Sequence, residues 1–274
     1  MTAGELPLIV AGWLLSFLMI SFLAGDLFLK WALRDEERFN NLPTKLLAGI
    51  LCVSSALAIG IFVLPLRLAV DWIILLFLVT ILWFLARRGN YVKFQPTGNL
   101  PESIFVLVIP LLVTAWCRDI LRPMELNGTL AVIRAWPDIF FHMCQIESLT
   151  SSRGIGSISD VSMVGATAHP YHIASYLLPA VLADVSGISG LIAFSSLLVP
   201  LGILLTALAA YSMGNLVFGK WPALAAGLGL MLLPDAFQQG LSMRFFSYHW
   251  SQQVGPAQCY GVACAAFAFT VLNR

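Results

Sequence analysis

The sequence predicts an all-α, polytopic transmembrane protein with a long outer loop that contains juxtamembrane helices. Of its 274 residues, 59% are hydrophobic and 11% are charged, whereas roughly 25% of an ordinary soluble domain is charged. Charged residues are absent from long stretches such as 46–66 and 186–219, and about 20 apolar residues are enough to cross a bilayer core. Lipid offers no partner for backbone polar groups, so runs of this kind cross as helices. A soluble domain is excluded.

Apolar runs of near-spanning length define the expected elements. The candidate spans are 8–31, 46–66, 70–86, 102–117, 189–212, 221–236 and 256–272. The fourth and sixth are the shortest. Residues 1–7 hold no positive charge, and the first run is longer than a signal-peptide core, so we expect it to be a retained helix.

Lysine and arginine set the expected orientation, because they collect on the cytoplasmic side of a membrane protein. They follow the first, third and fifth spans and the last one: Lys30, Arg34, Arg38, Lys45, Arg87, Arg88, Lys93, Lys220 and Arg274. The connection between the second and third spans has only Arg67. We therefore expect the N-terminus outside, and 118–171 and 236–255 outside with it.

Segment 171–185 leaves two interpretations open. It is apolar but short, and it carries polar or helix-breaking residues, namely Tyr171, His172, Pro179 and Asp184. A crossing here would put Lys220 and Arg274 outside. The charge bias therefore favours an amphipathic helix that lies in the outer interface.

The densest group of reactive side chains lies between Trp136 and Glu147. Pro137 suits the first turn of a helix, and a carboxylate at Asp138 favours the positive end of the helix dipole. His142 follows at i+4 on the same face, where it can hold the carboxylate or meet a polar ligand. The simpler interpretation is a dipole-stabilising Asp138 and a satisfied interfacial histidine.

A second group, His169, Tyr171 and His172, stands where the interfacial helix should begin. Tyrosine and histidine at an interface are usually amphipathic anchors. Together with His142 and Glu147 they match no zinc-ligand spacing. No metal site is predicted from them.

A third group occupies the second outer loop and is rich in planar hydrogen-bonding groups and aromatic rings. Its members are Asp235, Gln238, Gln239, Arg244, Tyr248, His249, Trp250, Gln252 and Gln253. Such groups bind sugars and other polyhydroxyl ligands, and an arginine can pair with a phosphate. A solvated loop with ordinary membrane-interface aromatics is the alternative.

Two acidic residues lie in or beside predicted spans and are candidates for buried functional groups. Asp26 lies in the first span and Glu102 at the edge of the fourth. For Asp26 an i, i+4 ion pair with Lys30 is the simpler interpretation. The five cysteines form no CxxC pair, and a net charge of +1 without a basic cluster excludes a nucleic-acid partner.

The order of elements in 102–274 resembles the integral-membrane glycosyltransferases of the C superfamily, which include protein O-mannosyltransferases and the aminoarabinose transferase of lipid A. Two motifs in the first outer loop carry the resemblance: PDIFFH at 137–142, followed by IESL at 146–149, and HPYHIASYL at 169–177. A span ending at Gly219-Lys220 and another ending in LPD at 233–235 also match the layout.

The resemblance implies three N-terminal spans in 1–101 and a glycosyltransferase-like core in 102–274, with outer loops 118–188 and 236–255. It implies transfer of a sugar from a polyprenyl-phosphate donor to a glycan, lipid or protein acceptor, on the outer face of the plasma (inner) membrane. Asp138 would act as general base, or would orient the acceptor and a divalent cation. His142 would orient Asp138 or bind the donor phosphate. The substrate-binding residues would be His169, Tyr171, His172, Arg244, His249 and Gln252.

The sequence also departs from the family. Ile139 follows Asp138 where the family commonly has a second acidic residue, and more spans are usual than follow Val254. The chain is therefore expected to be the N-terminal part of a longer protein or a shortened relative. The alternative function is a non-enzymatic carrier or assembly subunit. A carrier should have broken spans in matching halves, but Gly60, Pro110 and Pro200 do not pair in this way.

Overall fold

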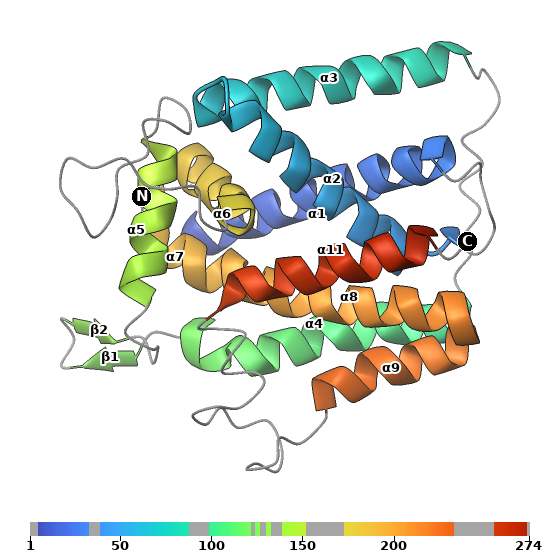
Figure 1. Ribbon diagram of the computed structural model, residues 1–274. Helices are drawn as coiled ribbons and strands as arrows, with labels where there is room; N and C mark the ends of the chain where they lie inside the picture. The colour runs from blue at the N-terminus through green and yellow to red at the C-terminus, as the bar shows by residue number, and fades with distance from the viewer. Residues whose placement is uncertain are drawn as a thin grey trace.

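The computed structural model describes residues 5–32, 39–87, 99–121, 124–126, 130–132, 139–151, 173–232 and 255–272. These residues form a helical bundle with one small hairpin (Figure 1). The elements are α1 (Glu5–Ala32), α2 (Leu42–Ile61), α3 (Leu66–Arg87), α4 (Leu100–Leu121), β1 (Met124–Leu126), β2 (Leu130–Val132), α5 (Ile139–Thr150), α6 (Ile173–Ser186), α7 (Gly190–Ala193), the π-helical η3 (Phe194–Leu198), α8 (Val199–Phe218), α9 (Lys220–Leu232) and α11 (Pro256–Leu272). The strands are antiparallel, with Met124 opposite Val132. The predicted all-α, polytopic helical fold class is confirmed.

Each predicted span coincides with a helix, although the boundaries differ. Within the described residues, four segments are long and apolar enough to cross a membrane: Leu14–Trp31, Leu42–Ile61, Leu100–Cys117 and Gly190–Phe218. The second begins four residues before the predicted start at 46, because Asn41 caps it by accepting a hydrogen bond from the Thr44 amide (3.0 Å). Pro43 in its first turn also suits a helix start.

The fifth predicted span is one long helix with a π-helical interruption. The amide of Val199 donates to the carbonyl of Phe194, an i→i+5 bond. Pro200 follows at once and lacks the N–H that an α-helix would donate to the carbonyl of residue 196. The wider turn therefore forms just before Pro200. The helix ends at Phe218, where Gly219 has a φ of 88° that favours glycine.

The bundle has two distinct ends (Figure 1). Helices α5 and α6, the β-hairpin and the N-terminus lie at one end, and the C-terminus lies at the other. We call the first the α5 end. The second is the lysine end, because Lys30 and Lys45 lie there. The hairpin follows α4 in the sequence, and α5 follows the hairpin. Both belong to the predicted first outer loop, and both lie at the α5 end (Figure 1).

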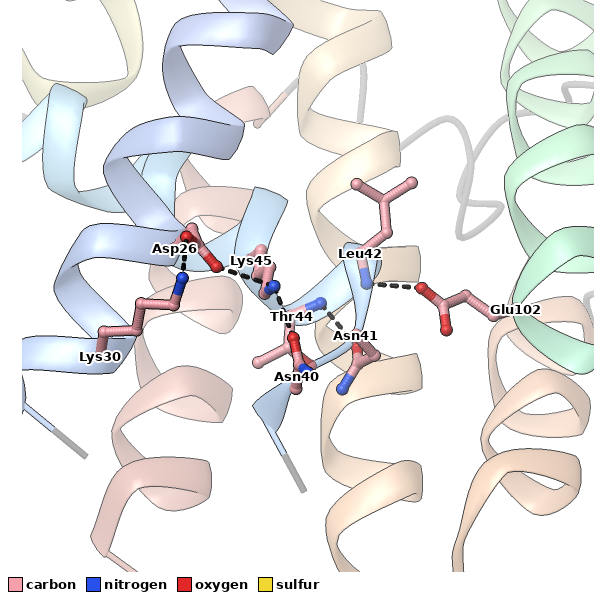
Figure 2. A network of polar contacts seen from close by, with 8 residues as sticks. All are labelled: Asp26, Lys30, Asn40, Asn41, Leu42, Thr44, Lys45 and Glu102. Atoms are coloured by element: carbon pink, nitrogen blue, oxygen red, sulfur yellow. Dashed lines mark hydrogen bonds and ion pairs between the residues drawn. The ribbon is translucent and has the colours of Figure 1, made fainter. Parts of the chain in front are cut away.

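A polar network joins helices at the lysine end (Figure 2). The carboxylate of Asp26 accepts from Lys30 (2.8 Å) and from Lys45 (2.7 Å), which ties α1 to α2. The predicted pairing of Asp26 with Lys30 is confirmed. Glu102, at the start of α4, is buried and accepts a hydrogen bond from the amide of Leu42 (2.7 Å). It therefore caps α2 from a neighbouring helix.

Helix α6 differs from the expected amphipathic helix. Every residue from 175 to 183 is buried, so the helix has no solvent-facing or lipid-facing side over that stretch. It packs against several elements, among them α2, α5 and α7. The prediction of an amphipathic α6 is wrong, because the segment lies inside the bundle. Its position relative to the bilayer stays a prediction.

One apolar core runs through the predicted N-terminal and C-terminal parts of the chain. It includes Leu47 of α2, Ile109 of α4, Leu177 of α6 and Leu205 of α8. Helix α3 lies at the edge of the bundle (Figure 1). Leu66 and Ala69 are buried against the bundle, whereas the rest of the helix exposes many large apolar residues: Leu68, Trp72, Ile74, Leu75, Leu76, Leu78 and Val79. An apolar helix of this kind suits a lipid environment.

Candidate functional site at the α5 end

The candidate site is built on the buried face of α5. Ile139, His142, Ile146 and Leu149 are buried, at the three- and four-residue spacing of one helical face. Their neighbours Phe140 and Phe141 are exposed. The spacing therefore turns His142 toward the protein interior and fixes the side of α5 that meets the bundle.

The imidazole of His142 is enclosed by side chains from two other elements. Its Nδ1 lies 2.7 Å from the hydroxyl oxygen of Tyr176 on α6, at hydrogen-bond distance. The ring of Phe194 stacks on it, with the centroids 5.5 Å apart and the planes at 10°. His142 is only 6% exposed. Helices α5 and α6 and the π-helical segment thus converge on one histidine.

A second contact fixes α5 against the start of α7. The Glu147 carboxylate accepts a hydrogen bond from the amide of Gly190, the first residue of α7. A Cβ atom at Gly190 would lie 2.7 Å from the carbonyl oxygen of Met143. Only glycine permits this close approach without a shift. The position of Phe194, one turn further on, follows from this anchor.

The π-helical turn also contributes to the geometry around His142. A π turn holds one more residue than an α turn, so it changes which side chains of a helix face a neighbour. Phe194 is the first residue of that turn and is buried. Its ring plane, nearly parallel to that of His142, restricts rotation of the imidazole. An imidazole held in this way has a fixed orientation, which acid–base catalysis and phosphate binding both require.

Most of the predicted site residues lie outside the part of the chain that the structure describes. These are Asp138, His169, Tyr171, His172, Arg244, His249 and Gln252. Asp138 is the residue that immediately precedes α5 in the sequence. Of the predicted set, His142 alone is described. Helices α5 and α6, which contain the described parts of the two motifs, are packed against each other.

Sequence reasoning missed three contributors to this site: Tyr176, Phe194 and the Glu147–Gly190 contact. Tyr176 belongs to the motif at 169–177, but nothing in the sequence pairs it with a histidine 34 positions earlier. Phe194 is one apolar residue among many in its span. Their roles depend on how α5, α6 and η3 pack.

The described residues offer no ligand set for the divalent cation that the resemblance allows. No group of three histidine, cysteine or acidic side chains able to hold a metal occurs among them. Nδ1 of His142 faces Tyr176, and an oxygen of Glu147 faces the Gly190 amide.

The comparisons with known proteins add no relative. No protein-family model, no curated protein and no solved structure matches the chain.

Proposed function

We propose that this protein is a multi-pass membrane glycosyltransferase that moves a sugar from a polyprenyl-phosphate donor to an acceptor outside the cytoplasm. One observation carries the proposal. The described parts of the two motifs behind the resemblance lie in α5 and α6, and these helices pack together at one end of the bundle, where His142 and Tyr176 are hydrogen-bonded. This is the arrangement that two cooperating juxtamembrane motifs require.

The composition and the arrangement of the helices support the membrane part of the proposal. Among the described residues, four helices are long and apolar enough to cross a bilayer, and the lysine end holds Lys30 and Lys45, two of the basic residues that the positive-inside rule assigns to the cytoplasm. The α5 end then faces the outside. This orientation would place the candidate site at the headgroup layer, where the phosphate of a polyprenyl-linked sugar lies.

In the proposed reaction, Asp138 removes the proton of the acceptor hydroxyl as general base. The acceptor oxygen forms a bond to the anomeric carbon, and the bond from that carbon to the phosphate oxygen breaks. Polyprenyl phosphate leaves with the electron pair. Arg244 and His249 stabilise the negative charge that develops on the phosphate, and His142 orients Asp138 or binds the donor phosphate. The proposed substrate contacts also include His169, Tyr171, His172 and Gln252.

The test compares three outer-loop aspartates in the full chain. Asp138→Asn keeps the shape of the side chain and removes its charge, and loss of a general base lowers the rate by roughly 10²–10⁴-fold. Asp119→Asn and Asp160→Asn are the matched controls and should retain transfer. The measurement is sugar transfer from a polyprenyl-phosphate donor, with membrane expression matched by blot.

Two results would overturn the proposal. Full activity in Asp138→Asn would remove the catalytic assignment, since a carboxylate that only stabilises a helix dipole contributes about 1 kcal/mol or less. Absence of transfer by the unmodified protein would instead favour the non-enzymatic alternative, a carrier or an assembly subunit.

A further inference from the structure

Two lysine–tryptophan pairs lie at the lysine end of the bundle, although they are far apart in the sequence. Lys30 and Trp31 stand in the last turn of α1, and Lys220 and Trp221 are the first two residues of α9. Trp31 is 82% exposed and Trp221 is 58% exposed. Both indole rings therefore project from the bundle instead of packing into its core.

Contacts between helices place the two pairs at the same end of the bundle. The ion pair of Asp26 with Lys45 joins the end of α1 to the start of α2, and Thr44 of α2 donates a hydrogen bond to Ser212 of α8 (3.1 Å). Helix α8 then leads into α9 at Gly219. Figure 1 shows the end of α1 and the start of α9 at this one end of the bundle.

The residue types at these positions match the boundary between lipid headgroups and acyl chains. An indole ring has an apolar body and a polar N–H, so tryptophan concentrates at that boundary. A lysine beside it can lay its aliphatic stem along the apolar layer and reach a lipid phosphate with its ammonium group. The ammonium group of Lys30 contacts Asp26 and still has N–H donors to offer.

Lys220 needs an anionic partner more than Lys30 does. It is exposed, and no ion pair of this residue occurs in the described part of the chain. A cation at the first residue of a helix is unfavourable, because the N-terminal end of the helix dipole is positive. The phosphate of a membrane lipid would supply the missing negative charge.

We infer that Trp31 and Trp221 anchor the lysine end at the headgroup boundary of a single phospholipid leaflet, where the ammonium groups of Lys30 and Lys220 contact lipid phosphates. This surface takes a phospholipid as its partner and lies at the end of the bundle opposite to the candidate site. The inference depends neither on sugar transfer nor on which side of the membrane is cytoplasmic.

The experiment measures the depth of each indole in a bilayer. The full chain is labelled with fluorotryptophan, placed in phosphatidylcholine nanodiscs and studied by ¹⁹F NMR, and Trp31→Phe and Trp221→Phe identify the two resonances. Broadening is compared for a nitroxide near the lipid glycerol group, a nitroxide at the end of the acyl chain and a water-soluble gadolinium chelate. Trp116 is the buried reference, since it is 4% exposed and donates to the Met231 carbonyl (3.0 Å).

We expect the nitroxide near the glycerol group to broaden the Trp31 and Trp221 resonances most, relative to Trp116, and to similar extents. Stronger broadening of either ring by the chain-end nitroxide or by the gadolinium chelate would overturn the inference. Clearly different depths for the two rings would overturn it as well, because one leaflet boundary could not then hold both.

Substitution of Lys220 tests the contact with lipid phosphate. Lys220→Leu should move Trp221 toward the chain-end nitroxide, because no charge then holds the start of α9 at the headgroups. Lys220→Arg keeps the charge and is the matched control, in which Trp221 should keep its depth. Lys30 is left unchanged, since its substitution would also break the pair with Asp26. An unchanged depth of Trp221 in Lys220→Leu would refute the lysine contact.

Discussion

Gly25 and Gly49 determine how closely α1 and α2 approach. A Cβ atom on Gly25 would overlap the carbonyl oxygen of Lys45, and a Cβ atom on Gly49 would overlap that of Ser21. Small residues at helix crossings allow this backbone contact, which is a main source of helix association in lipid. The close approach also brings Lys45 within 2.7 Å of Asp26.

Alanine at Gly25 or Gly49 should therefore destabilise the bundle. Overpacking typically costs about 1–3 kcal/mol, and we expect the upper part of that range because the neighbouring atoms belong to the backbone. The measurement is the unfolding temperature in detergent. Gly12→Ala is the control on the same helix, since nothing lies within 4 Å of the added Cβ. Equal stability of Gly12→Ala and Gly25→Ala would contradict the close crossing.

Glu102 shows how one residue links separate helices. Its carboxylate accepts from the Leu42 amide and from the side chain of Asn99, so α4 is connected to the start of α2. The sequence identified Glu102 as a candidate buried functional group. The structure gives its position a structural explanation, because the first amides of a helix need acceptors from outside it.

At the scale of the elements, the burial of α6 distinguishes a helix inside the bundle from a helix at the membrane interface. Leu178 and Leu182 lie one turn apart on one face of the helix and are at most 1% exposed, and Tyr176 and Leu177, which point in other directions, are at most 4% exposed. An interfacial helix would bury only one face. Because α6 is buried on all sides, truncation of a large side chain on any face of the helix should lower the stability of the protein.

Replacing Leu177, Leu178 or Leu182 with alanine, one at a time, should cost about 2–5 kcal/mol each. Unfolding in a graded denaturing detergent measures the loss. Val185→Ala serves as the reference substitution, since Val185 is 63% exposed at the end of the same helix. Tolerance of Leu177→Ala together with large losses in Leu178→Ala and Leu182→Ala would contradict burial on all sides, because Leu178 and Leu182 share one face of the helix and Leu177 does not.

At the scale of the whole molecule, the two ends of the bundle should lie on opposite sides of the membrane. Ser151 follows α5 at one end, and Asn40 hydrogen-bonds Lys45 at the other. Both are exposed. The distribution of lysine and arginine predicts that the Ser151 side is extracytoplasmic.

We therefore expect a cysteine at position 151 to react with an impermeant thiol reagent added to intact cells, and a cysteine at position 40 to react only after permeabilisation. Each single cysteine is introduced into a variant in which the five native cysteines, Cys52, Cys117, Cys144, Cys259 and Cys264, have been replaced. Labelling of position 40 in intact cells would reverse the orientation. It would also place the candidate site in the cytoplasm.

Much of the helical architecture was predictable because hydrophobicity is a local property of the chain. The run at 46–66 predicts a helix, and α2 spans Leu42–Ile61. The boundary shifted because capping by Asn41 outweighs the loss of apolarity at Lys45. For the candidate site, the spacing of Asp138 and His142 identified the histidine, whereas its partners on other elements escaped prediction.

The sequence by itself determined that the chain forms apolar helices and that Asp26 pairs with Lys30. These outcomes depend on composition, on i, i+4 spacing and on the transfer of apolar residues from water, all of which act within a few residues. Only the tertiary structure decided that Tyr176 and Phe194 meet His142, that Glu102 caps α2 and that α6 is buried. Those outcomes depend on which helices pack together, because many apolar surfaces satisfy the hydrophobic effect equally well, and close packing and hydrogen-bond geometry select one arrangement among them.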